Sequence, residues 1–171
     1  RLLWIKTTNI KIPFYSIFST KYNGTSDILG KHWRIPLFES KAYPRDKKSY
    51  IVHMPDGRIL AFVKTQKSNN LFYYKDVWTA SITKELFIVK SIYGIELHYK
   101  NGRLYRMKSP KNYGGYDMFF KYQKGKFIEL KSRSTIIAKC EYKGNEEIVI
   151  DFPNMKQSLE IIKQEKNKDE N

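Results

Sequence analysis

The sequence predicts an all-β protein, built mainly of antiparallel hairpins that form a closed or nearly closed β-barrel, with a short C-terminal helix. Three observations lead to this prediction. Apolar and polar residues alternate from about residue 9 to residue 152, which is the period of a half-buried strand. Turn signals separate the alternating runs about every 8–12 residues, as in sandwiches and barrels. Aromatic residues make up 15% of the chain, and they pack well on pleated surfaces.

The first part of the chain predicts two isolated strands and one hairpin. Residues 9–18 alternate as a strand that is bent or lies at an edge, because Pro13 interrupts it. A second strand is expected over residues 32–39, and the basic stretch 41–48 is expected to be a loop. A hairpin is expected over residues 50–63, because the Pro-Asp-Gly in its middle supplies a fixed φ, a local acceptor and a residue that tolerates positive φ.

The clearest local signal lies between residues 92 and 107, after two strands expected over 71–83 and 85–93. Asn101-Gly102 is the preferred pair for a two-residue type I′ turn. Pairing outward from this turn sets three pairs opposite each other: Lys100 with Arg103, Tyr99 with Leu104, and His98 with Tyr105.

The last third of the chain predicts two more hairpins and a helix. The hairpins cover residues 116–131 and 135–152, and each turns at a Lys-Gly pair. Residues 155–166 place apolar side chains at helical spacing. The expected organisation is therefore one antiparallel β domain over residues 1–154, followed by a short helix and charged tail over 155–171.

The chain is strongly basic, with a net charge of +15 from 32 basic and 17 acidic residues. Such an excess indicates an anionic partner, namely a membrane surface, a nucleic acid or an acidic protein. Most of the basic residues are lysines, and a lysine is a point charge rather than a bidentate fork. The composition therefore favours loose attraction to an anionic surface over specific base recognition. A solvated lysine surface, or AT-rich coding bias, would produce the same excess.

The positive charge is concentrated between residues 100 and 143, with twelve basic residues against three acidic ones and aromatic residues interleaved. Period-two alternation is expected to gather these cations on one exposed side of the sheet. Basic residues near anionic headgroups contribute about 1 kcal/mol each, and aromatic side chains suit such an interface. Single-stranded nucleic acid is bound with the same ingredients. The candidate anion-binding residues are Lys100, Arg103, Arg106, Lys108, Lys124 and Lys126.

The sequence contains no sharp catalytic or metal-binding motif, and no cofactor is expected. A single cysteine excludes an intrachain disulfide and a multi-cysteine zinc site. Because Cys140 lies on an alternating apolar face, it is predicted to be a buried core thiol. His32, His53 and His98 lie far apart in the sequence and are expected to be surface or strand residues rather than metal ligands.

The sequence shows no membrane-spanning segment, since no apolar run approaches the ~18–20 residues needed. It shows no signal-peptide pattern either. The chain begins with Arg1, so a leader or anchor could have preceded it. The expected location is the cytoplasm, with peripheral association at the membrane if the basic hairpins bind lipid.

One constellation suggests an enzymatic alternative. Asp117, followed after eleven residues by Glu129-Leu130-Lys131, resembles the Asp…Glu-x-Lys pattern of the restriction-endonuclease-like superfamily. Glu129 and Lys131 share one face of a strand, and Asp117 begins its neighbour. The resemblance implies a magnesium-dependent nuclease, in which two carboxylates hold the cation and the lysine stabilises the attacking hydroxide or the phosphate charge.

The rhythm of hairpins resembles the barrels of the tubby C-terminal, LURP-one and phospholipid-scramblase-like group. The segments that carry the resemblance are residues 50–64, with an Asp-Gly turn, 95–105, with an Asn-Gly turn, and 136–140, with the sequence Ile-Ile-Ala-Lys-Cys. The resemblance implies a closed antiparallel barrel around a central C-terminal helix, with basic surface residues that contact anionic lipids. Because the C-terminal segment here is short and largely polar, either the barrel is filled by its own Tyr and Phe side chains or the helix lies outside it.

Together these observations predict a non-enzymatic, basic β-barrel-like domain that associates with anionic lipid through its basic hairpins. Two alternatives stay open. One is nucleic-acid binding, or magnesium-dependent cleavage by Asp117, Glu129 and Lys131. The other is a protein-interaction module for an acidic partner.

Overall fold

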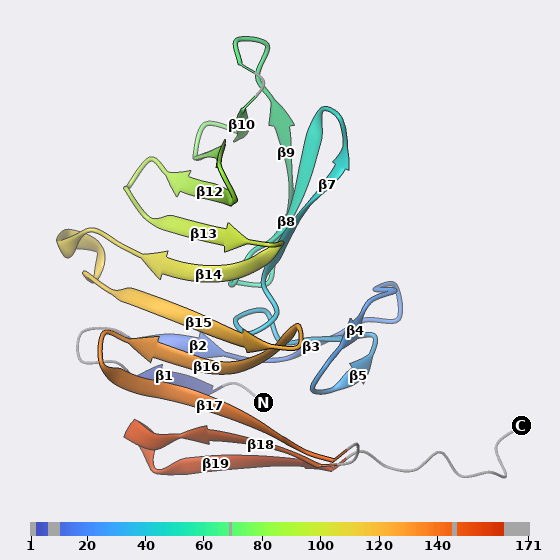
Figure 1. Cartoon of the computed structure of the whole chain (residues 1–171), viewed down its shortest axis with the longest axis vertical. Helices are drawn as coiled ribbons and strands as arrows, with labels where there is room; N and C mark the ends of the chain where they lie inside the picture. The colour runs from blue at the N-terminus through green and yellow to red at the C-terminus, as the bar shows by residue number, and fades with distance from the viewer. Residues whose placement is uncertain (1–2, 7–10, 69, 145–146, 163–171) are drawn as a thin grey trace, which may run out of the picture.

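The computed structural model describes residues 3–6, 11–68, 70–144 and 147–162 of the chain. Its regular elements are strands, apart from two single-turn 3₁₀ helices, η1 (Lys111–Tyr113) and η2 (Pro153–Met155). Figure 1 shows a barrel at the top and an open, twisted sheet below it. Both parts belong to one continuous sheet, because β14 is shared between them.

Eight antiparallel strands close into a barrel, which confirms the predicted fold class. The ring closes because β14 pairs with β13 on one side and with β7 on the other. The barrel strands are β7 (Lys41–Asp46), β8 (Ser49–His53), β9 (Ile59–Lys64), β10 (Leu71–Tyr74), β11 (Trp78–Thr83), β12 (Leu86–Ser91), β13 (Glu96–Lys100) and β14 (Arg103–Lys108).

Aromatic side chains fill the barrel. The rings of Tyr50 and Phe87 stack with centroids 4.3 Å apart, and Phe72 and Phe62 pack edge-on against Phe87. These residues point inward because successive strand residues face opposite sides of the sheet. Phe62 is fully buried, for example, whereas its neighbour Val63 is 43% exposed. The barrel is thus filled by its own side chains, and within the described residues no helix passes through it.

The open sheet continues from β14 through the two predicted C-terminal hairpins. Its strands are β15 (Asp117–Gln123), β16 (Lys126–Ser132), β17 (Thr135–Lys143), β18 (Glu147–Phe152) and β19 (Gln157–Ile162). The pairing register shifts at a β-bulge in β15–β16 and again in β16–β17. Because bulges bend a strand and increase its twist, the sheet curls around one face.

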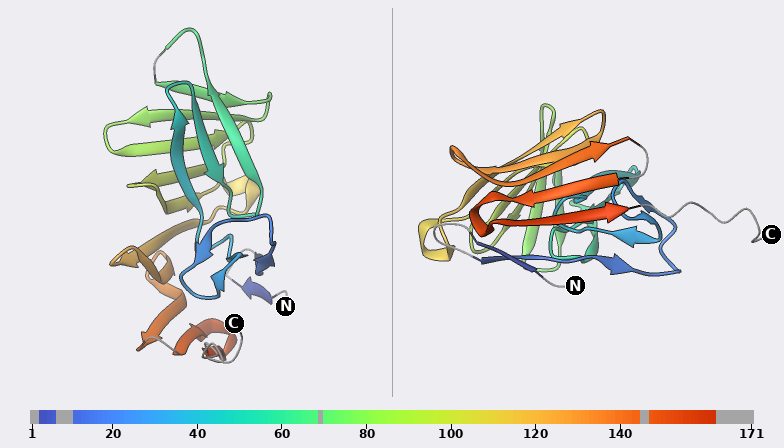
Figure 2. Two further views of the ribbon diagram at one scale, coloured as in Figure 1. Left: turned by 90° about the vertical axis from the view of Figure 1, so that its right-hand side faces the viewer. Right: turned by 90° about the horizontal axis from the view of Figure 1, so that it is seen from below.

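The N-terminal strands form a second layer against this curled sheet. They are β1 (Leu3–Lys6), β2 (Lys11–Phe14), β3 (Ile17–Phe18), β4 (Thr25–Ser26), β5 (Gly30–Lys31) and β6 (Trp33–Arg34). The right-hand view of Figure 2 shows these blue strands across from the orange and red ones. Phe38 stacks on Phe127 at 4.0 Å, and Phe14 contacts both Phe38 and Phe152. One hydrophobic core therefore runs through barrel, sheet and N-terminal layer.

The prediction of a C-terminal helix is wrong within the described residues. The segment Gln157–Ile162 is β19, which pairs antiparallel with β18 and sets Leu159 opposite Ile150. Leu159 and Ile161 pack against the core while Glu160 between them is exposed, so the effective period is two. A short polar helix is marginal in water, whereas the edge of β18 offers a full row of backbone partners. Residues 163–171 lie outside the described residues.

Four segments in the first half also differ from the prediction. The stretch 41–48 forms β7 and its turn rather than a loop; its Pro44 is tolerated because it sits at a bulge, on a strand that meets β14 only at its first residue. Residues 32–39 contain only the two-residue β6, and residues 71–83 divide into β10 and β11. Residues 11–18 contain β2 and β3, and residues 9–10 lie outside the described residues.

The turn at Asn101-Gly102 is formed as predicted, with φ values of 51° and 80°. Lys100 pairs with Arg103 and Tyr99 with Leu104, as expected, but a bulge then sets His98 opposite Arg106 instead of Tyr105. The same turn closes the barrel. The Ala42 amide donates to the Gly102 carbonyl at 2.9 Å, and the Leu104 amide donates to the Ser40 carbonyl at 3.1 Å.

We expect Phe62→Ala to lower the free energy of unfolding by about 3–5 kcal/mol, because it leaves a cavity in the aromatic centre of the barrel. The matched control is Val63→Ala, which alters the next residue on the outer wall and should cost less than about 1 kcal/mol. Urea denaturation of both variants measures the difference. Equal losses would show that the barrel interior is not packed as described.

Candidate anion-binding surface

Two of the six predicted anion-binding residues are neutralised within the chain. The Arg106 guanidinium donates two hydrogen bonds to the Asp117 carboxylate, at 2.8 and 2.7 Å. This contact lowers the pKa of Asp117 and raises that of Arg106. The Nζ of Lys108 lies 3.5 Å from the Glu96 carboxylate. Each of these two cations therefore already has a carboxylate partner within the chain.

The other three predicted lysines, Lys100, Lys124 and Lys126, lie at one edge of the sheet. In an antiparallel meander every second turn lies at the same edge, so the turns after β11, β13, β15 and β17 are neighbours. Figure 1 shows the last three at the right of the molecule. We call the five exposed lysines of these turns the basic edge: Lys84, Lys100, Lys124, Lys126 and Lys143. None lies within 4.0 Å of a carboxylate in the described part of the chain.

The outer face of the open sheet does not gather positive charge, contrary to the expectation from alternation. A cross-strand row on this face runs through Lys121, Glu129, Lys139 and Asp151, so that the charges alternate in sign. Opposite charges in register stabilise the sheet. The excess charge is therefore concentrated at the turns rather than on the face.

Tyrosine rings lie beneath the cations of this region. Lys100 lies 5.9 Å from the ring centroid of Tyr105, and Lys126 lies 5.0 Å from that of Tyr142. The hydroxyl of Tyr142 donates to the carbonyl of Phe127 at 2.9 Å, which fixes the ring in place. Each of these two rings thus already faces a cation of the basic edge.

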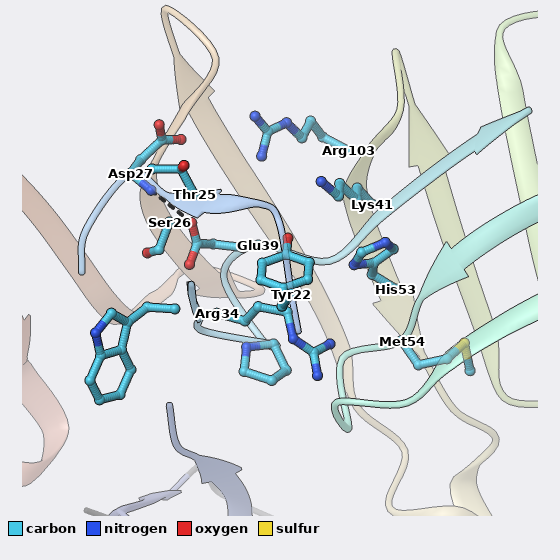
Figure 3. A pocket seen from close by; sticks show the side chains of 12 residues that line it. Tyr22, Thr25, Ser26, Asp27, Arg34, Glu39, Lys41, His53, Met54 and Arg103 are labelled. Carbon is cyan, nitrogen blue, oxygen red and sulfur yellow. Dashed lines mark hydrogen bonds between the residues drawn. The ribbon is translucent and has the colours of Figure 1, made fainter. Parts of the chain in front are cut away.

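Arg103 belongs to a different environment, a small pocket between the barrel and the N-terminal layer (Figure 3). The pocket has a volume of about 90 Å³. It lies where the seam between β7 and β14 meets the loops around β4 and β6. Its lining residues are Tyr22, Thr25, Ser26, Asp27, Trp33, Arg34, Pro36, Glu39, Lys41, His53, Met54 and Arg103.

One of the two acidic groups that line the pocket, the Glu39 carboxylate, is already held by the backbone. The two oxygens of Glu39 accept hydrogen bonds from the amides of Asp27 and Ile35, at 3.0 and 2.9 Å. Burial raises the pKa of Glu39 despite these bonds. Burial also lowers the pKa of Lys41, and the neighbouring Arg103 cation lowers it further.

His53 is buried on the same side of the pocket and is neutral at physiological pH. Burial lowers its pKa to about 4, and the cations of Lys41 and Arg34 add to the effect. Its Nε2 lies 3.2 Å from the hydroxyl of Tyr43.

The other two histidines make hydrogen-bond contacts within the chain, and the cysteine is buried in the core. The Nδ1 of His32 lies 2.7 Å from the carbonyl of Tyr22, and the Nε2 of His98 lies 3.1 Å from the Glu96 carboxylate. Cys140 is buried, as predicted, and burial raises the pKa of its thiol to about 11. Among the described residues, no three His, Cys, Asp or Glu side chains could together hold a metal ion.

The structure does not bring the two carboxylates of the nuclease alternative together. In the β15–β16 register Glu129 lies opposite Lys121, four residues along β15 from Asp117. At about 3.3 Å per residue this places them roughly 13 Å apart along the sheet. Lys131 lies between them opposite Phe119, and the Asp117 carboxylate is held by Arg106.

Sequence reasoning missed cations in both regions. Lys84 and Lys143 join the basic edge because alternate turns of a meander share an edge, a rule that the predicted hairpins alone could have supplied. Lys41, Arg34 and Arg103 line one pocket because the barrel closes there. No local sequence pattern predicts that these residues lie close together.

No model of a known protein family matches this chain, and no curated protein shows significant sequence similarity to it. In the ranges that the structure describes, no helix is both long and apolar enough to cross a membrane. Function must therefore be inferred from the geometry and charges of the molecule itself.

We expect the domain to lose about 1–2 kcal/mol of stability through His53 when the pH falls from 7 to 5. The pKa of this residue is about 4 in the folded state, against about 6.5 when unfolded, so acid favours the unfolded chain across this window. Urea denaturation at the two pH values, compared with His53→Gln, isolates the contribution. An identical pH dependence in the variant would show that His53 is not buried as described.

Proposed function

We propose that this protein is a non-enzymatic module that binds anionic membrane surfaces through its basic edge. The observation that carries the proposal is the row of five exposed lysines on four successive same-side turns, none paired with a carboxylate of the described chain. A planar anionic surface can meet several turns at once without a shaped pocket. The sequence resemblance to tubby and scramblase-like barrels implies the same class of ligand.

A lipid surface suits the edge better than a nucleic acid. Single-stranded nucleic acids rely on aromatic rings that stack with bases. Here Tyr105 and Tyr142 lie under Lys100 and Lys126, and the hydroxyl of Tyr142 is tied to a backbone carbonyl. Lysines supply charge without the fork geometry that reads bases. The basic edge therefore attracts anions through charge alone and presents no side chains that would recognise bases.

The strength of such binding follows from the number of lysines. Each basic residue near an anionic leaflet contributes about 1 kcal/mol, so the edge supplies a few kcal/mol in total. This is enough for reversible association. Because the lysines are solvent-exposed, salt should weaken the binding steeply as the Debye length falls from about 10 Å at 0.1 M to about 3 Å at 1 M.

We expect the triple variant Lys100→Glu, Lys124→Glu, Lys126→Glu to bind vesicles containing phosphatidylserine at least about 100-fold more weakly than the wild type, because three attractions of about 1 kcal/mol each are lost. Co-sedimentation with anionic and with neutral phosphatidylcholine vesicles, at low and high salt, measures the effect. The wild type should bind only the anionic vesicles, and only at low salt.

The matched control is the triple variant Lys111→Glu, Arg133→Glu, Lys156→Glu, whose exposed cations lie on the opposite edge. It carries the same net charge and should keep most of the binding. Equal loss in the two variants would show that only net charge matters and would contradict a docking edge. Binding to single-stranded DNA in preference to the vesicles would instead support the nucleic-acid alternative.

A further inference from the structure

We propose that the pocket at the barrel seam binds one hydrogen phosphate group, free or as a monoester, between Lys41 and Arg103. The site is separate from the basic edge, because none of the five edge lysines lines it.

The first observation is an uncompensated pair of cations. Lys41 and Arg103 lie directly opposite each other where β7 meets β14. Like charges in register destabilise a sheet. Neither has a carboxylate within 4.0 Å among the residues that the structure describes. The nearby Glu39 is already bonded to two backbone amides, so an external anion would relieve the repulsion.

The second observation is an unused donor. Nε of Arg34 is buried and makes no hydrogen bond, whereas Nη1 of the same side chain donates to the carbonyl of Gly57 at 3.1 Å. The guanidinium carbon lies 5.3 Å from the ring centroid of Tyr22. Arg34 thus adds a third positive charge to the pocket wall.

The third observation is the size of the pocket. A water molecule needs roughly 10–15 Å³ of cavity, so the pocket of about 90 Å³ holds a small group of several heavy atoms and no large ligand. A tetrahedral oxyanion fits these limits, and lysine and arginine are the side chains that bind phosphate in proteins.

The fourth observation selects phosphate over sulfate. Asp27 lines the wall across from Lys41 and Arg103, and Figure 3 shows its carboxylate on the far side of the pocket. An ionised carboxylate only accepts hydrogen bonds. Hydrogen phosphate carries a proton that it can donate to Asp27, whereas sulfate carries none and would meet Asp27 with a lone pair. The pocket therefore matches an oxyanion with negative charge on one side and a hydroxyl on the other.

Titration calorimetry and thermal unfolding at constant ionic strength test this proposal, with inorganic phosphate, phenyl phosphate and sulfate as the probes. Phosphate or phenyl phosphate should bind and raise Tm, because a ligand that binds only the folded state stabilises it. The stronger of the two shows whether the natural group is a free ion or a monoester. Sulfate should bind at least about tenfold more weakly, because it lacks the donated hydrogen bond.

Lys41→Gln should weaken phosphate binding about ten- to hundredfold, since a charge-assisted hydrogen bond is lost. Without ligand it should be no less stable than the wild type, because the repulsion from Arg103 is removed. Arg103→Gln should behave in the same way. It provides an independent test of the pocket if Lys41→Gln does not fold. Lys124→Gln, on the neighbouring turn, should bind phosphate like the wild type.

Two results would overturn the proposal. One is equal binding of sulfate and phosphate. The other is wild-type phosphate affinity in both pocket variants. The double variant Lys124→Glu, Lys126→Glu changes the basic edge away from Arg103, so it should retain phosphate binding whether or not the vesicle experiment succeeds.

Discussion

Closure of the barrel at the Asn101-Gly102 turn is the constraint on which both candidate surfaces depend. The turn requires positive φ at both residues, and its carbonyl at Gly102 accepts the Ala42 amide. A Cβ added to Gly102 would crowd the Ala42 carbonyl oxygen at 3.3 Å, and the positive φ of this residue would strain any other side chain. Behind the seam, the buried hydroxyl of Tyr99 lies 2.8 Å from that of Ser40, which ties the two sides together.

Closure of the barrel leaves two positively charged sites in one antiparallel meander, namely the basic edge and the pocket at the seam. Where strands pair in full, as on the outer face of β15–β18, cations and carboxylates alternate in register and little net charge accumulates. At the four turns of the basic edge, and at the seam between Lys41 and Arg103, no carboxylate of the described chain lies within 4.0 Å of these cations. The edge lysines are exposed and suit a broad anionic surface, whereas Lys41 and Arg103 are partly enclosed and suit a single small anion.

The fold was largely predictable from the sequence because its signals are local. Asn-Gly and Lys-Gly turns fix hairpins within a few residues, and the register around residue 101 was correct up to the bulge beside His98. Bulges and the use of Pro44 in β7 depend on the neighbouring strand and were missed. The polar segment of β19 pairs because β18 leaves an open edge. The pocket was unpredictable, since it joins Arg34 and Lys41 to a residue far along the chain.

The most direct test of this account is native-state hydrogen exchange at the amides of Ala42 and Leu104, the two donors that join β7 and β14 across the seam. If the turn closes the barrel, both amides should exchange as slowly as those of the central barrel strands, near the limit set by global unfolding. Exchange of both at unprotected rates, while β12 and β13 stay protected, would show an open barrel, and the pocket between Lys41 and Arg103 would not exist.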